Sequence, residues 1–463
     1  MLVRPPLLAV VLSLGGVAAC ATETDPEDVS VPPSITSAPE EPQDGGIDPR
    51  ALSPEAMHRP PLPIPKLVST AERCKLINGV GLEDPTANQT HFRANLMGTD
   101  LGISVRHDDR VFFFFGDTAG FRGIWRFGDS LPDAVGYADE SAAALAEDPS
   151  LLCSKLRFLG LDPDVSIGPS LDPRIERDFA GTSMTPPPGH TIGEFIHNPA
   201  GHGSFPTLPG DFEVPSGAFS HGGSIYVFFT TVDPSIQMKG SYLAKWSAPK
   251  TTGVPSYDIL YHVDQRFDAS GPLRGDFINV AAMVHGAYVY LYGTGDYRRS
   301  PVHLARKALA TIEQPGGFER FDGKTRTWVS AAAKADPVVA VAGNGEMSVV
   351  HYPEIDRFMM LNQLGTPGQN RVVARFSESP EGPWSDAIVV HDMGDPAFRA
   401  KYCCTKDACL GEQLFHCDRA GFYGTYLFPE ARVLPAGRFV VTYTMSTWDP
   451  YNVALMQATF AVP

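Results

Sequence analysis

The segment GTDLGISVRHDDRVFFFFGD, residues 98–117, contains two runs of strand-forming residues joined by a short polar turn. This pattern predicts an antiparallel hairpin in which the first residues of one strand lie beside the last residues of the other. If the pairing is centred between Asp108 and Asp109, Asp100 and Asp117 share one face with their Cβ atoms about 4.5–5.5 Å apart. Two carboxyl groups at that separation raise one pKa, as general acid–base catalysis requires. The alternatives are solvated acids or a calcium ligand pair, and a register shift of one residue would remove the argument.

Similar hairpins recur along the chain, each with a polar residue at its start, a turn containing Gly or Asp, and a strongly apolar second strand. The five copies are residues 98–117, 214–230, 276–293, 346–361 and 430–443. Repeated antiparallel units of this length predict an all-β fold, a five-bladed β-propeller in which neighbouring blades bury each other's faces. A pair of β-sandwiches is the competing architecture. A long loop insertion between the first and second blades, within residues 130–211, is expected to lie over one mouth of the propeller.

In a propeller, the residues that begin the innermost strands surround one central funnel, where side chains from all blades meet. In this sequence they are Asp100, Ser216, Asp276 or Asn279, Glu346 and Glu430. Pairing about Gly286 in the third blade would place Asp276 opposite Asp296, with a guanidinium nearby to keep one carboxylate ionised. We therefore expect Asp100 and Asp117 to be the catalytic pair. The expected substrate-binding or supporting residues are Asp276, Asn279, Asp296, Arg298, Glu346 and Glu430.

The N-terminal residues 1–19 are predicted to be an export signal. They contain an early arginine, an apolar run and Val-Ala-Ala directly before Cys20. This ending resembles a bacterial lipobox, which implies cleavage before Cys20 and lipid attachment to its sulfur; the alternative is an ordinary signal peptide. Residues 20–68 are predicted to be a disordered Pro-rich, acidic linker, and residues 69–463 the propeller domain. We therefore expect an exported protein that is tethered by lipid to the bacterial cell envelope, in the periplasm or at the cell surface.

Export permits disulfides, and six cysteines remain after Cys20, an even number that fits full pairing. Metal binding by the vicinal Cys403 and Cys404 is the alternative, but no zinc-type spacing supports it. The insertion also contains His190, Glu194, His197 and His202, in a Pro/Gly-rich loop rather than the helix that an H-E-x-x-H zinc site uses. We expect no cofactor and no metal, with structural calcium at the acids as the alternative. The disulfide candidates are Cys74, Cys153, Cys403, Cys404, Cys409 and Cys417.

The formal net charge of −16 disfavours nucleic acid and anionic polymers as partners and is compatible with a neutral polysaccharide. We expect a monomer that contacts the membrane only through its lipid.

Several stretches resemble the bacterial family known as domain of unknown function 4185. They are Asn88-Gln-Thr90, Met97 to Ile103, Phe115 to Thr118, Tyr292 to Arg298 and Val302 to Arg306. The resemblance covers the chain from roughly Cys74 to the C-terminus. Members with a known function are five-bladed propeller glycoside hydrolases that act internally on the D-arabinofuranose chains of mycobacterial arabinogalactan and lipoarabinomannan. The resemblance therefore implies an arabinan-like substrate and Asp100 and Asp117 as the catalytic pair. A non-catalytic propeller that binds glycan or protein is the rival interpretation.

Overall fold

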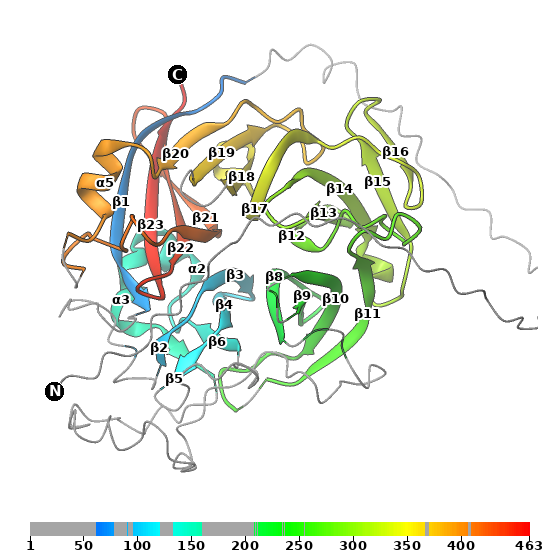
Figure 1. The fold of residues 1–463 in the computed structure, drawn as a ribbon, viewed down its shortest axis with the longest axis horizontal. Helices are drawn as coiled ribbons and strands as arrows, with labels where there is room; N and C mark the ends of the chain where they lie inside the picture. The colour runs from blue at the N-terminus through cyan, green and yellow to red at the C-terminus, as the bar shows by residue number, and fades with distance from the viewer. Residues whose placement is uncertain are drawn as a thin grey trace, which may run out of the picture. The chain divides into compact units, whose positions relative to one another are not determined.

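The computed structural model describes residues 62–77, 90, 96–120, 133–159, 208, 210, 212–233, 235, 237–253, 255–365, 370–405 and 409–463. The chain divides into two compact units, Met1–Pro61 and Leu62–Pro463, and all described residues belong to the second. Its strands form five blades around one axis (Figure 1), so the predicted five-bladed β-propeller is confirmed. The expected export signal, Cys20 and most of the linker lie outside the described residues. No described helix is long and apolar enough to cross a bilayer.

The first two blades are separate four-stranded antiparallel sheets with the strand orders β3-β4-β6-β7 and β8-β9-β10-β11. A two-strand ribbon of β2 and β5 extends the first hairpin. The elements of the first blade are β2 (Leu96–Gly98), β3 (Leu101–His107), β4 (Arg110–Asp117), β5 (Ala119–Gly120), β6 (Asp133–Tyr137), α2 (Ala142–Glu147), η2 (Pro149–Leu151), α3 (Leu152–Lys155) and β7 (Arg157–Phe158). Those of the second blade are β8 (Phe212–His221), β9 (Ser224–Val232), β10 (Met238–Ser247) and β11 (Tyr257–Gln265).

The predicted insertion 130–211 is in part a piece of the first blade, because β6, α2, α3 and β7 occupy residues 133–158. These elements supply the two outer strands that the hairpin β3–β4 needs to complete a blade. Residues 160–207 lie outside the described residues, and so do His190, Glu194, His197 and His202.

The third and fourth blades form one continuous hydrogen-bonded sheet, because β14 pairs with β17 at Ser300–Asn344 and Val302–Val339. The third blade contains β12 (Asn279–His285), β13 (Tyr288–Thr294), β14 (Ser300–Ala308), η3 (Leu309–Thr311), β15 (Phe318–Asp322) and β16 (Thr327–Ser330). The fourth contains β17 (Val339–Tyr352), η4 (Pro353–Ile355), β18 (Arg357–Leu364), β19 (Arg371–Ser377) and β20 (Ile388–Asp392), and α5 (Pro396–Tyr402) follows it.

The fifth blade is built from both ends of the domain. Its strands β21 (Phe422–Leu434), β22 (Arg438–Thr447) and β23 (Asn452–Ala461) are completed by β1 (Lys66–Ile77), which pairs antiparallel with β23. The N-terminal strand is therefore the outermost strand of the C-terminal blade, and the ring of blades is closed by backbone hydrogen bonds between residues far apart in the chain.

Five large hydrophobic clusters fill the interfaces between neighbouring blades, including the interface between the fifth blade and the first. The four consecutive phenylalanines of β4 show how one strand serves two interfaces. Phe112 and Phe114 belong to the cluster with the second blade, whereas Phe113 and Phe115 belong to the cluster with the fifth. An unbroken apolar run is typical of a strand that is buried on both faces, which explains why alternation is absent here.

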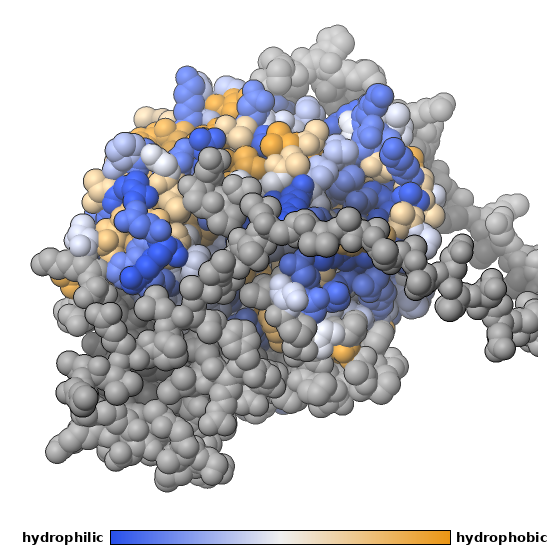
Figure 2. Space-filling view, in the orientation of Figure 1, coloured by the Kyte–Doolittle hydropathy of each residue, from blue (hydrophilic) through white to orange (hydrophobic). Residues whose placement is uncertain are grey.

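On the side seen in Figure 2, hydrophobic residues lie in small groups among hydrophilic ones and form no single dominant hydrophobic face. The large exposed hydrophobic side chains among the described residues are likewise scattered along the chain. They are Ile64, Val68, Phe267, Val341, Val389, Leu410, Val433 and Trp448.

All six cysteines that were predicted to pair are joined in disulfides. Cys403–Cys417 and Cys404–Cys409 close the loop after α5, as expected for a stapled loop, so these sulfurs are not free thiolates for a metal. The third disulfide, Cys74–Cys153, joins β1 in the fifth blade to α3 in the first. It therefore fastens the same closure that the pairing of β1 with β23 makes.

We predict that removing the Cys74–Cys153 disulfide by a double Cys→Ala substitution lowers the melting temperature more than removing Cys404–Cys409 in the same way. The two disulfides span 79 and 5 residues. Loop-entropy arguments give them about 4.5 and about 2 kcal/mol of stabilisation respectively. Calorimetry of both double variants measures the difference, and equal losses of stability would contradict the proposed role of Cys74–Cys153 in closing the ring.

Candidate active site

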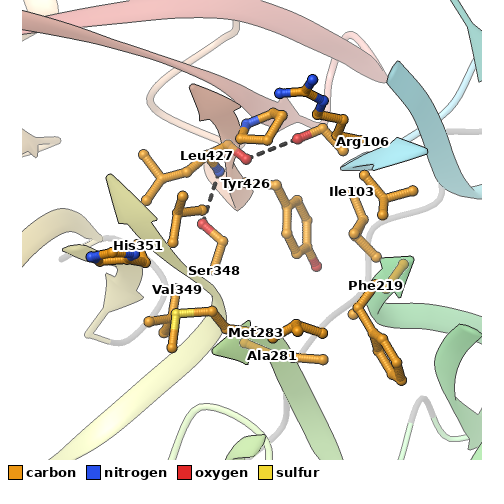
Figure 3. A pocket seen from close by; sticks show the side chains of 18 of the residues that line it. Ile103, Arg106, Phe219, Ala281, Met283, Ser348, Val349, His351, Tyr426 and Leu427 are labelled. Carbon is orange, nitrogen blue, oxygen red and sulfur yellow. Dashed lines mark hydrogen bonds between the residues drawn. The ribbon is translucent and has the colours of Figure 1, made fainter. Parts of the chain in front are cut away.

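Two cavities lie along the propeller axis, and both are lined mainly by the innermost strands β3, β8, β12, β17 and β21. The larger, which we call the axial cavity, encloses about 420 Å³ and is lined mostly by apolar side chains and serines. Figure 3 shows Tyr426 projecting toward the middle of its ring of side chains. The smaller, the mouth cavity, encloses about 150 Å³ and contains the acids Asp100, Asp117 and Glu346. Ser216 and Tyr426 line both cavities, but the three acids line only the smaller one.

The predicted pairing of β3 with β4 is correct for most of the hairpin and wrong at its open end. Ile103 pairs with Phe114 and His107 with Arg110, as centring between Asp108 and Asp109 requires, but Leu101 pairs with Phe115. Gly102, with φ of 93°, forms an irregularity that shifts the register by one residue. The Gly116 amide consequently donates to the Asp100 carbonyl, so Asp100 does not lie directly opposite Asp117.

The two carboxyl groups nevertheless enter the same cavity. The side chain of Asp100 lies over Gly116, where a Cβ would overlap its Oδ1 atom. A residue with a side chain at position 116 would therefore displace the carboxylate. Asp100 and Asp117 therefore do lie close together, as predicted. The cause is the irregularity at Gly102 and the absence of a side chain at Gly116, not direct cross-strand pairing.

Tyrosines hold Asp100 in place. The Tyr423 hydroxyl donates to Asp100 Oδ2 at 2.8 Å, and Tyr451 provides a second side-chain hydrogen bond. Desolvation raises the pKa of Asp100 to about 7, while these two hydrogen bonds oppose the rise because they favour the charged carboxylate.

Asp117 is more strongly disposed to hold a proton. Desolvation, followed by repulsion from Asp100, raises its pKa to about 8. The two acids titrate as a pair, and at neutral pH we expect the pair to retain at least one proton. One carboxyl can then donate a proton while the other acts as a base or nucleophile, which is the requirement for hydrolysis of a glycosidic bond.

An ion pair between Arg298 and Glu346 lies near Asp100 and Asp117. Arg298 donates to Glu346 Oε1 at 3.2 Å, and the Tyr297 hydroxyl donates to the same oxygen at 2.6 Å. The guanidinium lies between the rings of Tyr297 and Tyr423, 4.6 and 5.4 Å from their centroids. Because Tyr423 also binds Asp100, the ion pair and the Asp100 carboxyl are parts of one network. Of the two paired residues, Glu346 lines the mouth cavity, and Arg298 is held beside it by the ion pair.

Three of the predicted supporting acids are not at the mouth cavity. The predicted pairing of Asp276 with Asp296 is wrong, because β12 and β13 pair Asn279 with Thr294 and both acids lie outside these strands. Asp276 accepts from Arg320 at 2.5 Å, and Asp296 accepts from Arg266 at 2.5 Å, so each acid has a separate cation. A guanidinium does lie near Asp296, as expected, because Arg299 Nη1 is 3.8 Å from its Oδ2 atom, whereas Arg298 pairs with Glu346.

Glu430 lies toward the other end of its strand. It forms an ion pair with Arg106, which lines the axial cavity. The error arises because β21 begins at Phe422, eight positions before the expected start of the strand. Tyr423 and Tyr426 therefore take the cavity positions in the fifth blade. The high density of aromatic residues in FYGTYLF, residues 422–428, is the sequence signal of a strand that could have identified them. Asn279 and Ser216 do line the mouth cavity as predicted.

Among the described residues, one group of potential metal ligands gathers closely enough for an ion, and it consists of Cys404, Cys409 and His416. Its two cysteines are bonded to each other, so this group offers one free ligand only.

Residues 86–457 match the domain of unknown function DUF4185. The chain belongs to the DUF4185 family. The match includes the whole mouth cavity, and with it Asp100, Asp117, Arg298 and Glu346. Among curated proteins, no sequence matches the chain significantly.

Three solved structures illustrate what this DUF4185 chain is similar to. The α-L-arabinofuranosidase PaAbf62A from Podospora anserina, in complex with cellotriose, is 9% identical with a TM-score of 0.42, over 87% of this chain and 98% of that one. The catalytic domain of a Coprinopsis cinerea GH62 α-L-arabinofuranosidase is 11% identical with a TM-score of 0.44, over 86% and 98%. The Cellvibrio cellulosa α-L-arabinanase complexed with arabinohexaose is 11% identical with a TM-score of 0.38, over 77% and 91%.

We predict that Asp117→Asn stabilises the protein at alkaline pH. The folded-state pKa values of about 7 and about 8 exceed the ordinary 3.8, so the folded protein binds more protons than the unfolded chain from about pH 4 to pH 8. Stability therefore falls as pH rises through this window. Removing one charge should raise the melting temperature relative to the native sequence at about pH 9 and make little difference at about pH 4.

Thermal melts across that pH range test this prediction. Asp109→Asn, at an exposed position in the turn of the same hairpin, serves as the control. A pH-independent difference for Asp117→Asn, or the same pH dependence for the control, would show that Asp117 is not an acid held protonated by its surroundings.

Proposed function

We propose that this DUF4185 protein is a glycoside hydrolase that cleaves furanosidic polysaccharide, with an arabinan of D-arabinofuranose as the first substrate to test. The observation that carries the proposal is the pair Asp100 and Asp117, two carboxyl groups in one cavity whose pKa values are raised into the neutral range. The resemblance to family members that cleave D-arabinofuranose chains supports the choice of sugar. The net charge of −16 is compatible with a neutral polymer.

The environments of the two acids assign their roles. Asp117, with the higher pKa and repulsion from Asp100, is the proton donor to the leaving glycosidic oxygen. Asp100, whose carboxylate accepts hydrogen bonds from Tyr423 and Tyr451, is the ionised partner that acts at the anomeric carbon, as nucleophile or as the base for water. The configuration of the first product, read by NMR, distinguishes these two roles of Asp100.

Other groups at the mouth cavity suit the binding of a sugar. The Asn279 side chain is buried at the cavity wall, and its Oδ1 atom has no hydrogen-bond partner among the described residues. Glu346, held by Arg298 and Tyr297, offers a further oriented acceptor. We propose that these groups accept hydrogen bonds from sugar hydroxyls and that catalysis needs no metal or other cofactor. Activity should then survive dialysis against a chelator.

We predict that the purified propeller domain releases oligosaccharides from mycobacterial arabinogalactan and that Asp100→Asn and Asp117→Asn each lower the rate by at least about 100-fold, the range expected for loss of a general acid or base. Both substitutions preserve side-chain volume, so circular dichroism and thermal melts should show intact folds. Chromatography of the released oligosaccharides gives the rates.

The outcomes separate the hydrolase from the rival binding module. Release that depends on both acids supports the proposal. No release from arabinogalactan or from a panel of other furanosides, with measurable glycan binding, would overturn it in favour of a non-catalytic propeller. Release that persists in both variants would place the chemistry elsewhere.

We further propose that the protein is exported, carries lipid on Cys20 and acts as a monomer at the cell envelope. The Val-Ala-Ala-Cys ending of the N-terminal apolar segment supports this placement. In a bacterial host supplied with an alkyne-bearing fatty acid, the full-length chain should become labelled and enter the membrane fraction, whereas Cys20→Ala should remain unlabelled. Equal labelling of the two chains would contradict lipid attachment at Cys20.

A further inference from the structure

Phe267 lies in the segment that leads from β11 to β12, and this segment contacts sequence neighbours of residues that line the mouth cavity. The amide of the preceding residue, Arg266, donates to the carbonyl of Lys239 at 2.8 Å, and the neighbouring Met238 lines the cavity. The Arg266 guanidinium also binds Asp296, next to the cavity residue Tyr297. Two separate contacts of Arg266 therefore join this segment to neighbours of residues that line the cavity, between β11 of the second blade and β12 of the third (Figure 1).

The position is unfavourable for a phenylalanine on two counts. Its φ of 62° lies in the left-handed region, which favours glycine and is rare for bulky residues. The residue is 73% exposed, more than any other large hydrophobic residue described as exposed. Aromatic rings ordinarily stabilise a fold through burial, but Phe267 is mostly exposed and therefore adds little to the stability of the fold in this way. Folding alone therefore does not account for an aromatic residue here.

The ring is nevertheless held in a defined orientation. The Arg266 guanidinium stacks over it, 4.3 Å from its centroid, and is itself fixed by Asp296 at 2.5 Å. A cation over one face orients an aromatic side chain, and the high exposure shows that much of the ring is left accessible. A rigid, exposed aromatic face near a cavity suits a sugar ring, because one face of a sugar presents C–H groups that pack on an aromatic surface.

We propose that Phe267 is a stacking platform for a neutral sugar unit of the polysaccharide, outside the residue bound in the mouth cavity. The inference rests on the proposed glycoside hydrolase function and adds to it a binding subsite for a chain that extends beyond the cleaved bond. Arg266 and Asp296 are positioning residues that act through the ring. Asp296, predicted from sequence as a supporting residue, thereby gains a role away from the reacting atoms.

The test measures binding without cleavage. Isothermal titration calorimetry of arabinan oligosaccharides is carried out with the Asp117→Asn protein, alone and combined with Phe267→Ala, Phe267→Trp or Val433→Ala. Val433 is a control because it is similarly exposed but sits at the far end of β21 from Tyr423. Loss of one stacked ring should weaken binding of long oligosaccharides about fivefold to tenfold. Phe267→Trp should retain affinity, and Val433→Ala should change nothing.

A second measurement separates binding from folding. Phe267→Gly removes the ring and suits the left-handed backbone, so its melting temperature should equal or exceed that of the native sequence. A clear loss of stability in Phe267→Gly, or unchanged oligosaccharide affinity in Phe267→Ala, would overturn the inference. The proposed hydrolase fails by a different result, namely no cleavage by the native sequence, so the two failures are distinguishable.

Discussion

Burial of each blade on both of its faces is the constraint on which the rest of this structure depends. A sheet can be covered on both faces in this way only if every blade has two neighbours, and that requires a closed ring. The run Phe112 to Phe115 faces two blades at once, and Phe113 packs on Phe428 of the fifth blade with ring centroids 5.5 Å apart. The pairing of β1 with β23 joins the two ends of the domain within the fifth blade, and the disulfide Cys74–Cys153 ties that blade to the first.

The closed ring also creates the chemistry of the mouth cavity. The innermost strands bring side chains from all five blades to one axis, where Asp100 and Asp117 lose much of their solvation. Desolvation disfavours their charged forms, so the site carries an energetic cost above neutral pH that the interfaces between blades offset. The proposed reactivity and that local cost have the same physical origin.

Much of this architecture could be predicted from sequence, since each inner hairpin is a local unit with its own turn and apolar strand. The five hairpins and the pair Asp100 and Asp117 were found in this way. Predictions that depended on the exact strand register, or on the residue at which a strand begins, failed where the backbone departs from regular pairing. Gly102 shifts one residue in the first blade, and the early start of β21 places Tyr423 at the cavity instead of Glu430. The role of β1 escaped prediction because its partner strand lies more than 370 residues away in sequence, beyond any local pattern.

The central claim is that Asp100 and Asp117 share protons in a desolvated cavity at neutral pH. The most direct measurement is an NMR titration of the protein with ¹³C-labelled aspartate carboxyls, assigned with Asp100→Asn and Asp117→Asn. We expect two carboxyls that titrate near and above neutrality, with each substitution lowering the apparent pKa of the remaining acid. Two carboxyls that titrate independently in the ordinary acidic range of aspartate would contradict it.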